Sequence, residues 1–172
     1  MGRDGVVRSS KRIIRVTPSL TDLTAMTDGD VLFSGAEIPN AVLEKGGCSK
    51  LIAAFAVTET YAVFDAHIVV TEKTVSLGSP NATSNVAFDD LVAANVLGNL
   101  KAFATGDTNA DIDNANISQL SSMGLDGIHE FSLPILLQAE AGGTSIYFGA
   151  VLADDYDASN ADSIQFIFHI ED

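Results

Sequence analysis

The C-terminal end of the chain carries the feature that most constrains the fold, an alternation of apolar residues with a period of two. Ile164, Phe166, Phe168 and Ile170 occupy every second position there. This period predicts a β-strand with one buried face, because successive side chains of a strand point to opposite sides of its sheet. Such a strand needs a second layer to cover its apolar face, so the chain must fold as a sheet packed on another layer.

Other segments repeat this signal along the chain. Segments rich in β-branched and aromatic residues lie at 13–17, 31–33, 50–58, 62–71, 99–105, 117–123, 127–138 and 145–152. Turn signals, such as Gly46-Gly47 and Ser79-Pro80-Asn81, separate them. Short strands at regular spacing predict an all-β fold, an antiparallel β-sandwich or jelly roll of about eight to ten strands. Long helices between the strands, which a parallel sheet needs, are not indicated.

One short helix is expected near residues 88–97. Asn85 is a candidate cap, and Asp89-Asp90 suits the positive end of a helix dipole. Val92 would belong to its buried stripe, and Gly98 would end it.

Charge is distributed unevenly along the sequence. The formal net charge is -14, yet the first 15 residues hold five of the nine cations and one acid. The remaining residues hold four cations and 22 acids, so the body of the chain is strongly acidic. We therefore divide the chain into a flexible basic arm, residues 1–12, and a single β-sandwich domain, residues 13–172.

Two interpretations of the basic arm remain open. It is either a solubilising terminus or an arm that reaches an acidic partner surface. On the second interpretation, Ile13 and Ile14 are apolar anchors beside the cations. The expected contact residues are Arg3, Arg8, Lys11, Arg12, Ile13, Ile14 and Arg15.

The composition also excludes several classes of partner. The acidic body repels phosphate backbones, so we expect no nucleic acid partner for the folded domain. No stretch approaches the roughly 20 apolar residues of a membrane span, so we expect no membrane partner. Cys48 is the single cysteine, which rules out an intramolecular disulfide. We expect it to be a small buried residue and not a reactive thiol.

Motifs that carry chemistry are missing from the sequence. His67, His129 and His169 are far apart and form no H-x-H or H-E-x-x-H motif. There is no nucleophile elbow, phosphate-binding loop or dinucleotide fingerprint. The adjacent carboxylates Asp89-Asp90 and Asp154-Asp155 do not face a common bond as a glycosidase requires. We therefore expect no enzymatic activity and no cofactor.

The best metal candidate is an acidic segment with oxygen-bearing side chains at alternate positions, as in a calcium loop. These side chains belong to Asp107, Asn109, Asp111 and Asp113. The segment departs from the calcium pattern because Ile112 stands at the glycine position and Ser118 at the final glutamate position. The other interpretation is a solvated acidic loop without a metal.

The order of the segments resembles a known family. The matching segments are Ile14 to Thr17, Asp30-Val31-Leu32-Phe33, Ile38-Pro39-Asn40-Ala41-Val42 with Gly46-Gly47, Val75-Ser76-Leu77-Gly78 with Asn81, Leu97-Gly98, Leu133-Pro134-Ile135-Leu136-Leu137 and Ile146-Tyr147-Phe148-Gly149-Ala150-Val151. In this order they resemble small virion proteins of marine tailed phages that decorate or cement the head. The resemblance covers about residues 13–172. Family members have neutral or polar loops where this chain has acidic ones, and a less pronounced basic arm.

The resemblance implies a structural protein on the capsid surface of a virion. It would bind the major capsid protein and stabilise the head, and the family has no catalytic residues. Because no signal peptide is visible, we expect synthesis in the host cytoplasm. We expect self-association as a homotrimer at local three-fold axes, with a dimer as the second choice. The alternative function is a carbohydrate- or receptor-binding β-sandwich module on the tail or head, because jelly rolls also serve as lectins.

Overall fold

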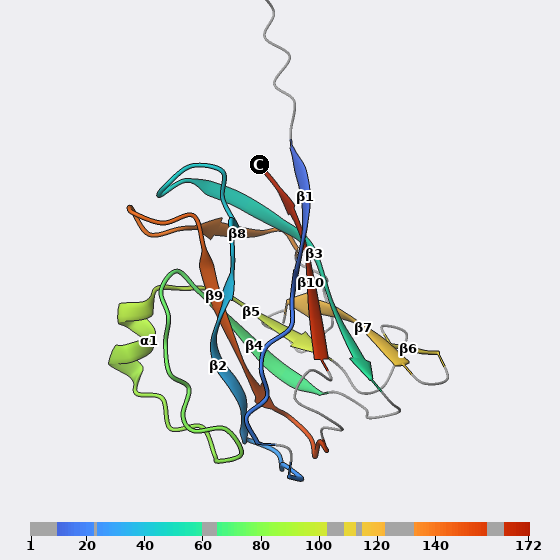
Figure 1. The fold of residues 1–172 in the computed structure, drawn as a ribbon. Helices are drawn as coiled ribbons and strands as arrows, with labels where there is room; N and C mark the ends of the chain where they lie inside the picture. The colour runs from blue at the N-terminus through green and yellow to red at the C-terminus, as the bar shows by residue number, and fades with distance from the viewer. Residues whose placement is uncertain are drawn as a thin grey trace, which may run out of the picture.

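The computed structural model describes residues 10–22, 24–59, 65–102, 109–112, 115–122, 133–157 and 164–172. These residues form ten strands and one short helix (Figure 1). The strands are β1 (Lys11–Val16), β2 (Val31–Ile38), β3 (Cys48–Glu59), β4 (Ala66–Thr71), β5 (Val96–Ala102), β6 (Asn109–Ile112), β7 (Ala115–Ser122), β8 (Ile135–Gln138), β9 (Ile146–Leu152) and β10 (Ile164–Glu171). The helix α1 spans Phe88–Ala94.

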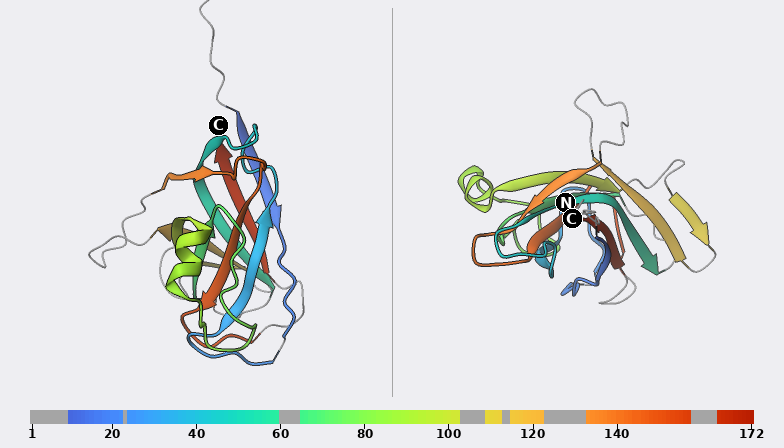
Figure 2. Two further views of the ribbon diagram at one scale, coloured as in Figure 1. Left: turned by 90° about the vertical axis from the view of Figure 1, so that its left-hand side faces the viewer. Right: turned by 90° about the horizontal axis from the view of Figure 1, so that it is seen from above.

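The strands form two antiparallel sheets that pack against each other, which confirms the predicted all-β sandwich. Sheet I has the order β1-β10-β3-β7, with β8 paired to β3 and β6 paired to β7. Sheet II has the order β5-β4-β9-β2. A short pairing of β5 with β7 joins the two sheets along one side. Seen from above, the strands curve around a common interior, with β1 and β2 at the two ends of the strand order (Figure 2).

The core is built around aromatic side chains from both sheets. The predicted period of two in β10 is confirmed, because Phe166 and Phe168 are fully buried. Phe148 of β9 reaches them from sheet II, with ring centroids 5.1 Å from each in edge-to-face geometry. Phe33 of β2 completes the cluster at 5.3 Å from Phe148. Edge-to-face packing of this kind adds to the stabilisation that burial alone provides.

Arg12 connects β1 to the chain that follows β2. Its guanidinium donates hydrogen bonds to the carboxylate of Asp172, with 2.9 Å between Nε and Oδ2. It also donates to the backbone carbonyl oxygens of Asn40 and Ala41. These charge-assisted bonds tie the first strand, the last residue and the loop after β2 together. The sheet therefore begins at Lys11, so Lys11 and Arg12 of the predicted arm belong to β1.

The helix begins at Phe88 as predicted, but it ends earlier, at Ala94, and its caps differ from those expected. Ala87 occupies the N-cap position without a side-chain hydrogen bond, so Asn85 is not the cap. Asn95 ends the helix in the left-handed conformation at φ 54°, and Gly98 lies inside β5. The predicted buried stripe is also wrong, because Val92 is 61% exposed. The residues after 95 instead pair with β4, and this pairing makes them a strand.

Other predicted strands shift by a few residues. The segment predicted at 99–105 begins earlier, as β5, and the one predicted at 117–123 is β7. Of the segment predicted at 127–138, the structure describes only 133–138, which contains β8 after Pro134. No helix within the described ranges has the length and apolar character needed to cross a membrane.

Candidate interaction surface

The strand β1 divides the predicted contact residues between two sides of sheet I. Ile14 faces inward and packs against the core. Arg12 lies on the same inward side, and its guanidinium is occupied by Asp172 and by two backbone carbonyls. Arg3 and Arg8 lie outside the described residues. Arg12 and Ile14 therefore help to hold the domain together and do not form an exposed contact surface.

Lys11, Ile13 and Arg15 of β1 point outward, and Ile13 extends a surface that crosses sheet I. We name it the outer apolar patch and define it by six residues at outward positions. They are Ile13 of β1, Ile167 of β10, Phe55 and Val57 of β3, Ile117 of β7 and Ile112 of β6. The strand register places Ile167 opposite Phe55, and Val57 opposite Ile117.

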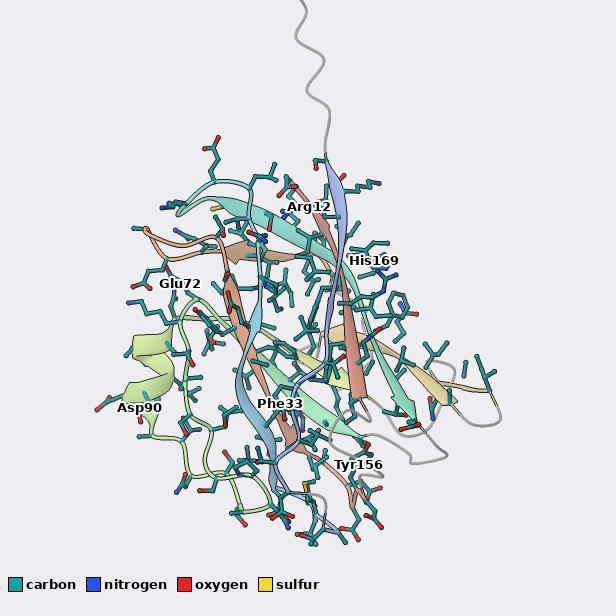
Figure 3. The ribbon with its side chains drawn as sticks, viewed as in Figure 1. Arg12, Phe33, Glu72, Asp90, Tyr156 and His169 are labelled. Atoms are coloured by element: carbon teal, nitrogen blue, oxygen red, sulfur yellow. The ribbon has the colours of Figure 1, made fainter. Side chains whose placement is uncertain are left out.

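The patch is apolar at its centre and exposed at its edges. Ile13 is 53% exposed and Ile112 is 56% exposed, whereas Ile167, Phe55 and Val57 are half-buried by their neighbours on the same face. The His169 ring lies against Phe55, with 5.4 Å between the ring centroids. His169 lies on the β1 and β10 side of the molecule, away from Glu72 and Asp90 near α1 (Figure 3).

The ratio of cations to carboxylates near the outer apolar patch differs from that of the whole chain. Lys11, Arg15 and Lys50 occupy outward positions on β1 and β3. Glu171 lies between Lys11 and Lys50 in the register, and Glu59 stands at the far end of β3. Among the described residues, three cations thus accompany two carboxylates on this face, whereas the chain as a whole carries a net charge of -14.

Part of the outer face of sheet II, at β9 and β2, is covered by the chain itself. We name residues 74–87 the cover segment, which runs beside β9 and β2 and leads into α1 (Figure 2). Leu77 in this segment is 1% exposed, and its backbone N–H donates to Ser34 Oγ at 3.0 Å. A Cβ on Gly149 of β9 would lie 2.7 Å from Leu77 Cδ1, so the segment packs directly on the sheet.

Sequence reasoning missed most of the outer apolar patch, although a signal was present. An antiparallel sheet with one solvated face alternates apolar and polar residues, whereas a sheet covered on both faces shows continuous apolar runs. Ile167 interrupts the alternation of the last strand with an apolar residue at an outward position. The run from Leu51 to Val57 contains no polar residue at all. Both runs predict that something covers the second face of sheet I.

The other predicted sites have mixed outcomes. Cys48 is exposed at the start of β3, so the predicted burial is wrong. The loop expected around the calcium candidate contains a strand, since Asn109 and Asp111 lie in β6 and pair with β7. Asp107 and Asp113 lie outside the described residues, so calcium binding stays a prediction.

The histidines do not meet at a common site in the described part of the chain. His67 lies on β4, opposite Lys101 of β5. Burial lowers the pKa of His67, and the nearby charge of Lys101 lowers it further. His169 is on the other sheet, and His129 is outside the described residues. Among the described residues, no group of three or more histidine, cysteine or acidic side chains could hold a metal ion.

Comparisons with known proteins add no identification. No protein-family model matches the chain, and a search of the curated proteins found no match.

Proposed function

We propose that this protein decorates or cements the head of a tailed phage by binding the outer surface of the major capsid protein shell. The proposal draws on the segment order that resembles head decoration proteins. The observation that carries it is the placement of the cations. Five of the nine lie in the first 15 residues, and three of those five are on β1.

The fold gives the basic arm a rigid base. β1 pairs with β10 along its whole length, and Arg12 fixes its start to Asp172. Lys11 and Arg15 point outward from this base, and Arg3 and Arg8 precede it in the sequence. We assign the cations that precede β1 in the sequence, Arg3 and Arg8, to an acidic surface on the coat. Many copies on one shell multiply a weak single contact through avidity.

Binding to undecorated capsids tests this proposal. Deletion of residues 1–9 removes Arg3 and Arg8 but keeps Ser10, whose carbonyl accepts a hydrogen bond from Asp172. We expect the truncated chain to bind more weakly, with a shallower dependence on salt, because exposed charge pairs are screened by ions. Co-sedimentation at two or more salt concentrations measures both quantities.

A matched control removes two cations from elsewhere on the chain. Lys45→Gln with Lys73→Gln removes two cations, as the deletion does, and both lysines are exposed. This variant should keep the salt dependence of the full chain. Unchanged affinity and salt dependence after the deletion would reject the role of the arm.

The carbohydrate-binding alternative calls for exposed aromatic rings. Of the tyrosines, Tyr156 is 3% exposed, Tyr147 is half-buried, and Tyr61 lies outside the described residues, whereas Phe88 of α1 is 78% exposed. A glycan array with the purified chain separates the two functions. Specific sugar binding, together with no binding to capsids, would replace the proposal with the alternative.

A further inference from the structure

We propose that the outer apolar patch is the docking surface for a second copy of this chain. This inference goes beyond the proposed function and does not rest on it. The first argument is the sequence pattern of the strands that form the patch. Phe55, Val57 and Ile167 stand at outward positions where a solvated antiparallel sheet would carry polar residues. Apolar residues on both faces of a strand are expected where both faces are covered.

The second argument is charge. A copy with a net charge of -14 is repelled by most of the surface of another copy. Near α1 the surface carries Glu72, Asp89 and Asp90, and a further acidic group follows β9 at residues 154–157. In the described part of the chain, the face around the outer apolar patch carries three cations and two carboxylates. Two like copies therefore meet the least repulsion when these faces approach each other.

The third argument is area. The patch crosses five strands, which lie about 4.8 Å apart and rise about 3.3 Å per residue. Over roughly seven residues of strand length, such a face covers on the order of 500 Å². Two faces together would remove on the order of 1,000 Å² from water, which reaches the lower limit for a specific interface. The area therefore fits a weak dimer, at the small end of biological interfaces.

The register on sheet I is also self-complementary. Phe55 of β3 lies opposite Ile167 of β10, and Lys50 lies opposite Glu171 on the same two strands. A two-fold axis that runs between these strands and parallel to them exchanges β3 and β10 between copies. It sets Phe55 against Ile167 of the second copy and Lys50 against Glu171 of the second copy. Both basic arms then leave the dimer at the same end.

Sedimentation of the full chain tests the inference. We expect the wild type to form a dimer of twice the 18.0 kDa chain mass at micromolar concentrations. Phe55→Thr keeps a residue that suits a strand but removes the central ring. It should weaken the dimer by about tenfold or more, as expected for a central aromatic contact. Circular dichroism establishes whether this variant keeps its fold.

A second patch variant and a control keep the test valid if Phe55→Thr does not fold. Ile13→Asp changes an edge residue that is already 53% exposed, so the fold should tolerate it while the dimer weakens. Val92→Asp introduces the same charge at a residue that is 61% exposed on α1, and it should leave the dimer intact.

Three results would overturn the inference. One is a wild-type chain that stays monomeric. Another is a dimer that both patch variants leave unchanged, which would place the interface elsewhere. The third is loss of capsid binding by the patch variants of a chain that is monomeric in solution. That result would show that the outer apolar patch binds the major capsid protein and not a second copy. Deletion of residues 1–9 should leave the dimer unchanged, so failure of the arm proposal and failure of the dimer are distinguishable.

Discussion

The two sheets share one core, but their outer faces differ in what covers them. On sheet II, the cover segment lies on β9 and β2, and Leu77 is almost completely buried. On sheet I, Ile13 and Ile112 remain exposed at either side of the outer apolar patch. A sheet with apolar residues on both faces needs a cover on each. The chain supplies one cover from its own sequence, and we infer that a second copy supplies the other.

The largest expected effect compares two leucines on opposite outer faces. Leu77→Ala removes a buried side chain from the cover segment and should lower the free energy of unfolding by about 3 kcal/mol. Leu136→Ala on β8 of sheet I removes the same atoms from a residue that is 59% exposed, and should cost less than about 0.5 kcal/mol. Denaturant unfolding measures both. Equal losses in the free energy of unfolding would show that the outer faces of the two sheets are covered to the same extent.

A smaller effect is expected from Gly149, where the cover segment meets β9. Gly149→Ala places a Cβ 2.7 Å from Leu77 Cδ1 and 3.1 Å from the carbonyl oxygen of Phe33. Either the leucine or the strand must shift, at a cost of about 1–3 kcal/mol. Gly142→Ala is the matched control, because a Cβ there would meet nothing within 4 Å. A thermal melt in which the two variants lose equal stability would argue against direct packing on sheet II.

The outer apolar patch should contribute little to the fold of one copy. Ile13→Thr keeps a β-branched side chain at an exposed strand position, so its free energy of unfolding should change by less than about 0.5 kcal/mol. The measurement needs a protein concentration low enough to keep the chain monomeric, because binding between copies adds apparent stability. A large loss at that concentration would mean that the patch is part of the core of one copy.

The smallest expected effect depends on pH and concerns the outer face of sheet II. Burial holds the pKa of His67 below its ordinary value of 6.5, so the unfolded chain takes up a proton first as the pH falls. The free energy of unfolding should therefore decline as the pH drops below 6.5, and this contribution should level off below the folded pKa. His67→Asn should flatten that decline between pH 7 and the onset of carboxylate titration. If the free energy of unfolding of His67→Asn declines with pH as steeply as that of the wild type, His67 is not the source of the decline.

The helix and the cysteine show where local sequence signals were insufficient. Asn85 and Gly98 have the residue types of a cap and a stop, but Asn95 ends the helix earlier because Val96 onward pairs with β4. Cys48 follows two glycines and was expected inside, yet it is exposed at the start of β3. Neither outcome depends on the residue alone. Each depends on which strand lies next to the segment.

The sequence by itself determined the class of fold and the inward side of the last strand. It could do so because the side-chain period of a strand is two, and every second residue from Ile164 to Ile170 is apolar. Only the tertiary structure decided which outward residues become neighbours. Ile13, Phe55 and Ile167 come from strands far apart in the sequence, and backbone hydrogen bonds in one register bring them onto one face. The periodicity of each strand fixes which of its residues point inward, but a register shifted by two residues would keep that pattern and change the neighbours.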